Sequence, residues 1–134
     1  MQVTFSKVIN EFHQTFNLDK SEIEEVFYKP DTTDIMGGTY VSAKHVDGFS
    51  ILITFEMSGN NVKIMNAYKI FPKMLEKNIF KMKAGEILFE FMNKYGTDVD
   101  IPNVGKHKIF FDHKKRLFFQ GILDIDKYMK DMKS

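Results

Sequence analysis

Four histidines are the side chains of this chain that could most readily bind a metal ion or move a proton near neutral pH. They are His13, His45, His107 and His113. No two of them have the His-x3-His spacing that places two metal ligands on one face of a helix. The chain also has no cysteine, which excludes a thiolate site. We therefore predict no metal site and no cofactor.

Carboxylates are concentrated between residues 19 and 34. Some belong to a predicted helix and others to the polar segment after it. One interpretation is a solvated helix face whose acids complement the helix dipole. The other is an acidic surface that docks a basic partner, because opposite potentials steer such contacts. The predicted partner-binding residues are Asp19, Glu22, Glu24, Glu25, Asp31 and Asp34.

Basic residues and phenylalanines are interleaved between residues 106 and 119. Positive charge beside aromatic rings is how proteins hold single-stranded nucleic acid, through phosphate attraction and base stacking. This segment is therefore the alternative binding site, for nucleic acid or another anionic ligand. A protein contact and a purely structural role stay open for it as well. The predicted anion-binding residues are Lys106, Lys108, Lys114, Lys115 and Arg116.

No catalytic residue is predicted. The sequence has no Gly-x-Ser-x-Gly elbow, and no serine has a histidine at a useful spacing. The glycines at 37 and 38 precede a predicted strand, whereas a phosphate-binding loop follows a strand and opens a helix. Catalytic groups can converge only in the fold, so a small enzyme with a site near Tyr40 and His45 is the second alternative.

Length and composition indicate one globular domain of 134 residues. A hydrophobic fraction of 43% and 14 phenylalanines are enough for a core. The net charge is +1, but residues 1–67 are net acidic and residues 68–134 net basic, an uneven layout that can favour charged partners. No apolar run has the length of a membrane span, no secretory signal is visible, and the lack of cysteine fits a reducing compartment. We expect a cytoplasmic protein.

Hydrophobic alternation predicts a three-strand meander over residues 39–46, 49–57 and 62–71. Turn residues separate these strands, and Pro72 ends the third. The first and third strands of the meander would be open edges, to which a partner could add a strand. A later hairpin would pair residues 107–112 with 117–122.

Apolar residues spaced three and four apart predict helices over 5–16, 22–28 and 83–95, and a last helix after Asp124. Residues 31–38 are expected to form a loop, and 72–82 an irregular connection with a helical turn. The order αα-βββ-α-ββ-α has no regular βαβ alternation, so it favours a single α+β domain. The predicted sheet is mainly antiparallel, with about five strands from the meander and the hairpin, and with helices packed on one face.

In general character the chain is similar to small bacterial immunity proteins and phage-encoded inhibitors. The features that carry this similarity are short length, an α+β pattern, abundant lysine, asparagine, isoleucine and phenylalanine, and no cysteine. The similarity implies a protein that neutralises a toxin domain by covering its active site. We therefore expect a protein-binding module rather than an enzyme, with a toxin domain as partner and no membrane association.

Overall fold

A computed structural model describes residues 1–36, 38–96, 99–101, 105–107, 110–112, 117–119 and 123–133, with the four short strands between 99 and 119 described by their backbone. The strands are β1 (Gln2–Phe5), β2 (Thr32–Met36), β3 (Thr39–Val46), β4 (Phe49–Ser58), β5 (Asn61–Ile70), β6 (Val99–Ile101), β7 (Gly105–His107), β8 (Phe110–Asp112) and β9 (Leu117–Phe119). The helices are α1 (Lys7–Phe12), α2 (Lys20–Tyr28), α3 (Pro72–Leu75), the 3₁₀ turn η1 (Ile79–Lys81), α4 (Ala84–Tyr95) and α5 (Ile125–Lys133).

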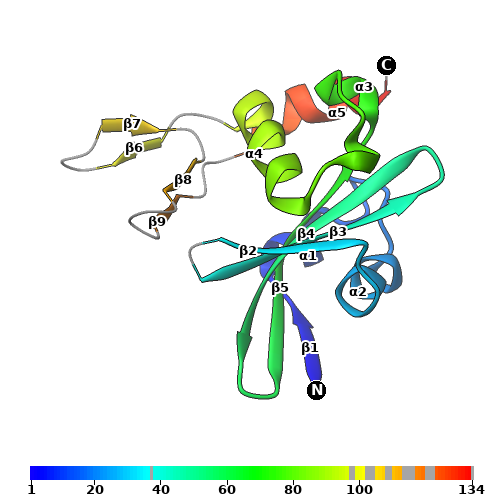
Figure 1. Cartoon of the computed structure of the whole chain (residues 1–134), viewed down its shortest axis with the longest axis vertical. Helices are drawn as coiled ribbons and strands as arrows, with labels where there is room; N and C mark the ends of the chain where they lie inside the picture. Colours follow the sequence, from blue (N-terminus) through cyan, green and yellow to red (C-terminus); the bar gives the residue numbers. More distant parts are fainter. Residues whose placement is uncertain are drawn as a thin grey trace.

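Five strands form one mixed sheet in the order β1-β5-β4-β3-β2 (Figure 1). Strands β2 to β5 are antiparallel neighbours, and β1 runs parallel to the beginning of β5. The predicted meander is confirmed as β3, β4 and β5, and the α+β class is confirmed with it. The hairpin β4–β5 carries a bulge at Thr54/Phe55, where the register shifts by one residue on the β5 side.

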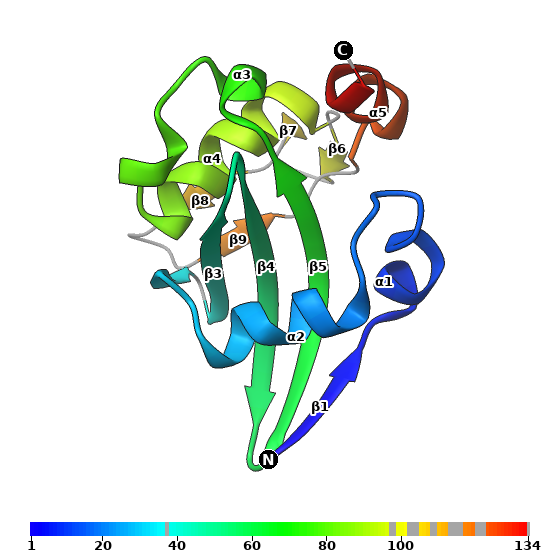
Figure 2. The ribbon, with the colours of Figure 1, turned by 90° about the vertical axis from the view of Figure 1, so that its right-hand side faces the viewer.

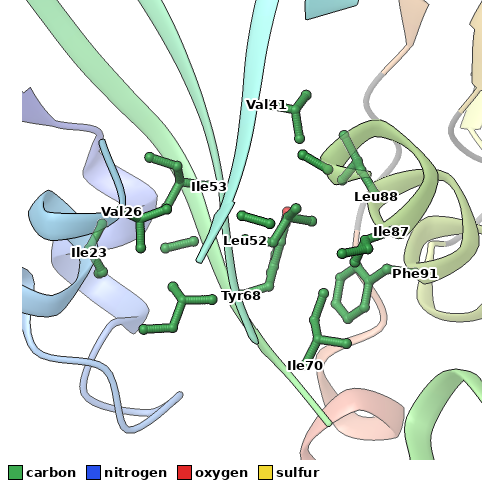
Figure 3. Packing of buried hydrophobic residues seen from close by; sticks show 14 of the residues in the cluster. Ile23, Val26, Val41, Leu52, Ile53, Tyr68, Ile70, Ile87, Leu88 and Phe91 are labelled. Carbon is green, nitrogen blue, oxygen red and sulfur yellow. The ribbon is translucent and has the colours of Figure 1, made fainter. Parts of the chain in front are cut away.

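Helices cover both faces of the sheet. Helix α2 lies across one face and α4 across the other (Figure 2). Figure 3 shows Ile53 pointing toward α2, whereas Leu52, the residue before it in β4, lies on the side of α4. Both side chains are fully buried. The prediction of helices on one face was therefore wrong, because β4 is a central strand with apolar residues on both faces.

The sheet also differs from the prediction in which segments supply its outer strands. Residues 32–36, predicted to be loop, form β2 against β3, and residues 2–5, predicted partly as helix, form β1 against β5. The later hairpin is confirmed in part, since β8 pairs with β9, but these strands form a separate two-stranded sheet. The meander strand β3 is thus an inner strand, whereas β5 is covered by β1 only along residues 61–64. The edges of the sheet belong to β2 on one side, and to β1 and the second half of β5 on the other.

The first helix begins later than predicted because Ser6, not Thr4, is its N-cap. The Ser6 hydroxyl accepts a hydrogen bond from the Ile9 N–H and donates one to the Met65 carbonyl of β5. Thr4 is part of β1, and its hydroxyl donates to the Val62 carbonyl. The pairing of residues 2–5 with β5 therefore decides the structure at Phe5, although the spacing of the apolar residues predicted that the helix begins there.

Candidate interaction surface

Strand β2 presents unpaired backbone groups at one edge of the sheet. In an antiparallel ladder, successive residues bond alternately to one neighbouring strand and to the other. In β5, both backbone groups of Lys69 bond the Tyr128 hydroxyl, outside the sheet. The registers of the paired strands extend this alternation from β5 through β4 and β3 to β2. As a result, the N–H and C=O groups of Thr33 and Ile35 face away from β3. No hydrogen bond to those four groups is found in the described part of the chain.

One side of this edge is apolar because of Ile35. Its side chain is 64% exposed and lies opposite Tyr40 in the register of β2 and β3. The Tyr40 ring stacks on Phe55, with ring centroids 5.2 Å apart, and Phe55 contacts Phe27 of α2 edge-on. Ile35 therefore extends the α2 side of the sheet beyond the covering helix.

The other side of the edge opens into a groove between β2 and the beginning of α4. The groove has a volume of about 530 Å³ and contains Met82, partly buried, and Phe89, which is 41% exposed. Its rim carries charges of both signs, including the ion pair between Lys77 and Glu90 at 2.9 Å. An apolar floor with a charged rim is typical of a protein contact surface.

Two side chains of β2 fix the start of α4 beside this groove. The Thr32 hydroxyl accepts a hydrogen bond from the Ala84 N–H at 3.2 Å, and Asp34 Oδ2 accepts one from the Gly85 N–H at 2.7 Å. These are the amides that a helix N-terminus leaves unsatisfied, and a carboxylate also complements the helix dipole there. Gly85 allows the close approach, because a Cβ atom at this position would lie 2.8 Å from Met36 Sδ.

The structure gives several of the six predicted acidic residues hydrogen bonds inside the protein. Asp34 holds α4 on the sheet face opposite α2, Asp31 Oδ2 accepts the His45 N–H at 2.6 Å, and Glu22 Oε1 accepts the Asp19 N–H at 3.0 Å. These contacts support the structural interpretation for three of the carboxylates.

Of the other three acids, Asp19 is the N-cap residue of α2, and Glu24 and Glu25 line a shallow depression on the outer side of this helix. Its remaining lining residues are Ser21, Tyr28 and Lys29, and its volume is about 450 Å³. Tyr28 is 55% exposed. An acidic contact centred on α2 would therefore consist of Glu24 and Glu25 beside an exposed aromatic ring.

The predicted anion-binding segment is described only in part. Lys106 belongs to β7, where the backbone pairs with Asp100 of β6. Lys108, Lys114, Lys115 and Arg116 lie outside the described residues. Anion binding by this segment stays a prediction.

The structure does not join Tyr40 and His45 in a common site. His45 pairs across β3 and β4 with Ser50, and its Nδ1 atom lies 2.7 Å from the Ser50 hydroxyl. Sequence reasoning missed this serine–histidine pair, although the predicted turn between the strands 39–46 and 49–57 places the two residues opposite each other. Ser50 is fully buried and Phe80 contacts the partly buried His45 ring edge-on, so the pair helps to join β3 to β4.

A cluster of aromatic residues connects α4, α5 and the β5 edge. The Tyr128 ring contacts Phe16, Tyr68, Phe91 and Tyr95, and it is fully buried. Burial raises the pKa of the Tyr128 hydroxyl above its ordinary value, although its hydrogen bond with the Lys69 backbone acts in the opposite direction. Burial and then the hydrogen bond to Asp131 raise the pKa of Tyr95 in the same way.

Among the described residues, no three histidine, aspartate or glutamate side chains are grouped so that they could hold a metal ion. None of the helices in the described ranges has both the length and the apolar character needed to cross a membrane.

Comparisons with protein families, curated proteins and solved structures found no match to this chain.

Proposed function

We propose that this chain is a protein-binding module that takes up an extended segment of its partner as an additional strand on β2. The observation that supports this most is the outward-facing backbone of Thr33 and Ile35. Four main-chain groups there can bond a partner strand as β3 bonds β2. Natural proteins usually shield or charge such an edge, whereas this one places an exposed isoleucine on it.

The surroundings of the edge favour a partner strand with apolar residues on both sides. Successive side chains of a strand point to opposite faces of the sheet. One set of partner side chains would contact Ile35, and the other would enter the groove beside Met82 and Phe89. The main-chain bonds would give affinity, and the two apolar contacts would give preference for a sequence.

The partner that we propose is a toxin domain, which the chain would neutralise in the bacterial cytoplasm by covering its active site. This part of the proposal rests on the small size, the α+β pattern and the composition of the chain. It is tested by co-expressing the protein with the product of the gene immediately upstream. A stable complex with a product that is toxic when expressed alone would support it. A non-toxic product, or separation of the two proteins during purification, would contradict this choice of partner.

The use of the β2 edge is tested with two variants at one position. Ile35→Ala removes the exposed side chain and keeps the outward N–H, whereas Ile35→Pro removes both. Proline is tolerated at such an edge because the lost N–H does not bond a neighbouring strand. We expect Ile35→Ala to weaken partner binding by roughly tenfold and Ile35→Pro by at least a further tenfold, measured by calorimetry. Equal affinities of the two variants would contradict strand addition, provided that both unfold near the temperature of the parent protein.

The acidic side of α2 is a second candidate contact surface, favoured by exposed Tyr28 beside Glu24 and Glu25. Replacing both acids by glutamine should lower the affinity for a basic partner and flatten its dependence on salt. Unchanged affinity together with an unchanged salt dependence would rule this surface out.

Nucleic-acid binding by the segment from 106 to 119 is the alternative function. It would give affinity for oligonucleotides that falls steeply with salt. Replacing Lys114, Lys115 and Arg116 together by alanine should abolish that binding, and binding that survives the change would exclude the segment. A small enzyme is the second alternative, for which no specific site is proposed.

A further inference from the structure

Among the described residues, Ala67 interrupts the hydrogen bonding along the second half of β5. Before this residue, the Ser6 hydroxyl donates to the Met65 carbonyl, and after it the Tyr128 hydroxyl bonds both the N–H and the C=O of Lys69. Since residues 65, 67 and 69 face the same way, the N–H and C=O of Ala67 also point away from β4. Neither group has a hydrogen-bond partner in the described ranges, although Ala67 is only 6% exposed.

These two polar groups lie at the wall of a cavity between α1, β5 and the beginning of α5. Figure 2 shows both helices on the same side of β5. The cavity has a volume of about 270 Å³ and is lined mainly by apolar side chains, among them Ile9, Phe12, Phe16 and Ile125. No lysine, arginine, aspartate or glutamate is found among the described residues that line it, and the polar side chains there are those of His13, Asn66 and Tyr68.

The size and polarity of the cavity restrict what could occupy it. A dry apolar cavity of about 150 Å³ holds benzene, and sites for drug-sized ligands begin near about 300 Å³. A charged ligand would lose its hydration without a countercharge. A buried N–H and C=O that lack partners cost free energy, which a ligand with one acceptor and one donor side by side would recover.

We propose that this cavity binds a small, uncharged molecule that has an apolar ring and an amide edge. The ring packs against Phe12 and Phe16. The amide carbonyl accepts from the Ala67 N–H, and the amide N–H donates to the Ala67 C=O. The site is separate from the proposed function, because it lies on the β5 side of the sheet and the partner strand would lie on the β2 side.

The probes are benzamide, which has both the ring and the amide edge, benzoate, which is charged and lacks the donor, and toluene, which has the ring alone. Each is titrated into ¹⁵N-labelled protein. We expect benzamide to bind with a dissociation constant on the order of 1 mM and to shift the Ala67 amide resonance downfield. Benzoate and toluene should bind roughly tenfold more weakly. An unmoved Ala67 resonance at saturating benzamide, or equal binding of the three probes, would overturn the proposal.

Two tryptophan variants on α1 locate the site. Val8 is 50% exposed at the cavity mouth, so Val8→Trp should block entry without altering the core. Asn10 is exposed on the same helix and does not line the cavity, so Asn10→Trp is the matched control. Loss of benzamide binding in Val8→Trp with retention in Asn10→Trp supports the proposal. Retention in both variants, each with a parent-like spectrum, overturns it.

Discussion

Replacing Tyr128 by phenylalanine would test how the C-terminal helix is attached to the sheet. The Tyr128 hydroxyl accepts from the Lys69 N–H and donates to the Lys69 C=O, both at 2.7 Å. Tyr128 is fully buried and Lys69 is 8% exposed. The substitution removes one oxygen atom and leaves the ring in its contacts with Phe16 and Phe91.

The expected cost follows from the two backbone groups that lose their partner. A neutral hydrogen bond contributes about 1 kcal/mol net, but a buried group left without any partner costs about 1–3 kcal/mol. Because water has little access to this position, we expect Tyr128→Phe to lower the free energy of unfolding by about 3 kcal/mol. Tyr95→Phe makes the same chemical change. Its hydroxyl donates to Asp131, whose side chain is 31% exposed and can be hydrated instead, so we expect a cost of about 1 kcal/mol.

Urea unfolding of the parent and the two variants measures both costs. With a denaturant dependence of about 2 kcal/mol per molar, the midpoint of Tyr128→Phe should fall by about 1.5 M. Amide exchange gives a second readout, because the Lys69 N–H should lose its protection. A cost below about 1 kcal/mol for Tyr128→Phe, or a larger cost for Tyr95→Phe, would refute this account of the attachment.

Three further perturbations follow from the same contacts. Above pH 10, Tyr128 of the unfolded chain ionises while the buried hydroxyl of the folded protein stays neutral, so the free energy of unfolding should fall with rising pH, by at most about 1.4 kcal/mol per pH unit from this residue. Urea unfolding of Tyr128→Phe should show a shallower fall with pH. An equal slope in the parent protein and the variant would contradict this expectation. Asp34→Ala should lower the free energy of unfolding by about 1 kcal/mol, because it removes the acceptor of the Gly85 N–H. Asp34→Asn should lower it clearly less in thermal unfolding, since the amide oxygen can still accept that hydrogen bond. Leu52→Ala should lower the free energy of unfolding, measured with urea, by about 3–5 kcal/mol, because Leu52 is fully buried in the central strand. Ile35→Ala should lower it by less than about 0.5 kcal/mol, because Ile35 is exposed. Similar values for the two variants would be inconsistent with the burial described.

The central strands and the longest helix could be predicted from the sequence because each contains its own signal. Strands β3, β4 and β5 alternate at period two between clear turns, and α4 carries an uninterrupted apolar stripe. Strand β2 was missed because it is short and half polar, and because its pairing depends on β3. Its run of two threonines before Ile35, followed by two glycines, was the signal that could have indicated a hairpin.

The candidate surface could be predicted less well, since side chains with the same charge have different roles. Among the six acidic residues, Asp31, Asp34 and Glu22 accept backbone N–H groups, whereas Glu24 and Glu25 face outward on α2. Nothing in residue type separates these two groups. The difference depends on which amide lies within reach after folding.

The sequence by itself determined the local periods, the turns between the meander strands and the α+β class, because these depend on residues close together along the chain. Only the tertiary structure decided which strands form the edges and which faces the helices cover. On the β1 and β5 side these features depend on contacts between residues about sixty positions apart, such as Ser6 with Met65 and Tyr128 with Lys69, and on the other side on the pairing of β2 with β3. Among the described residues, the outward backbone groups at Thr33, Ile35 and Ala67 are therefore where the structure adds most to the question of function.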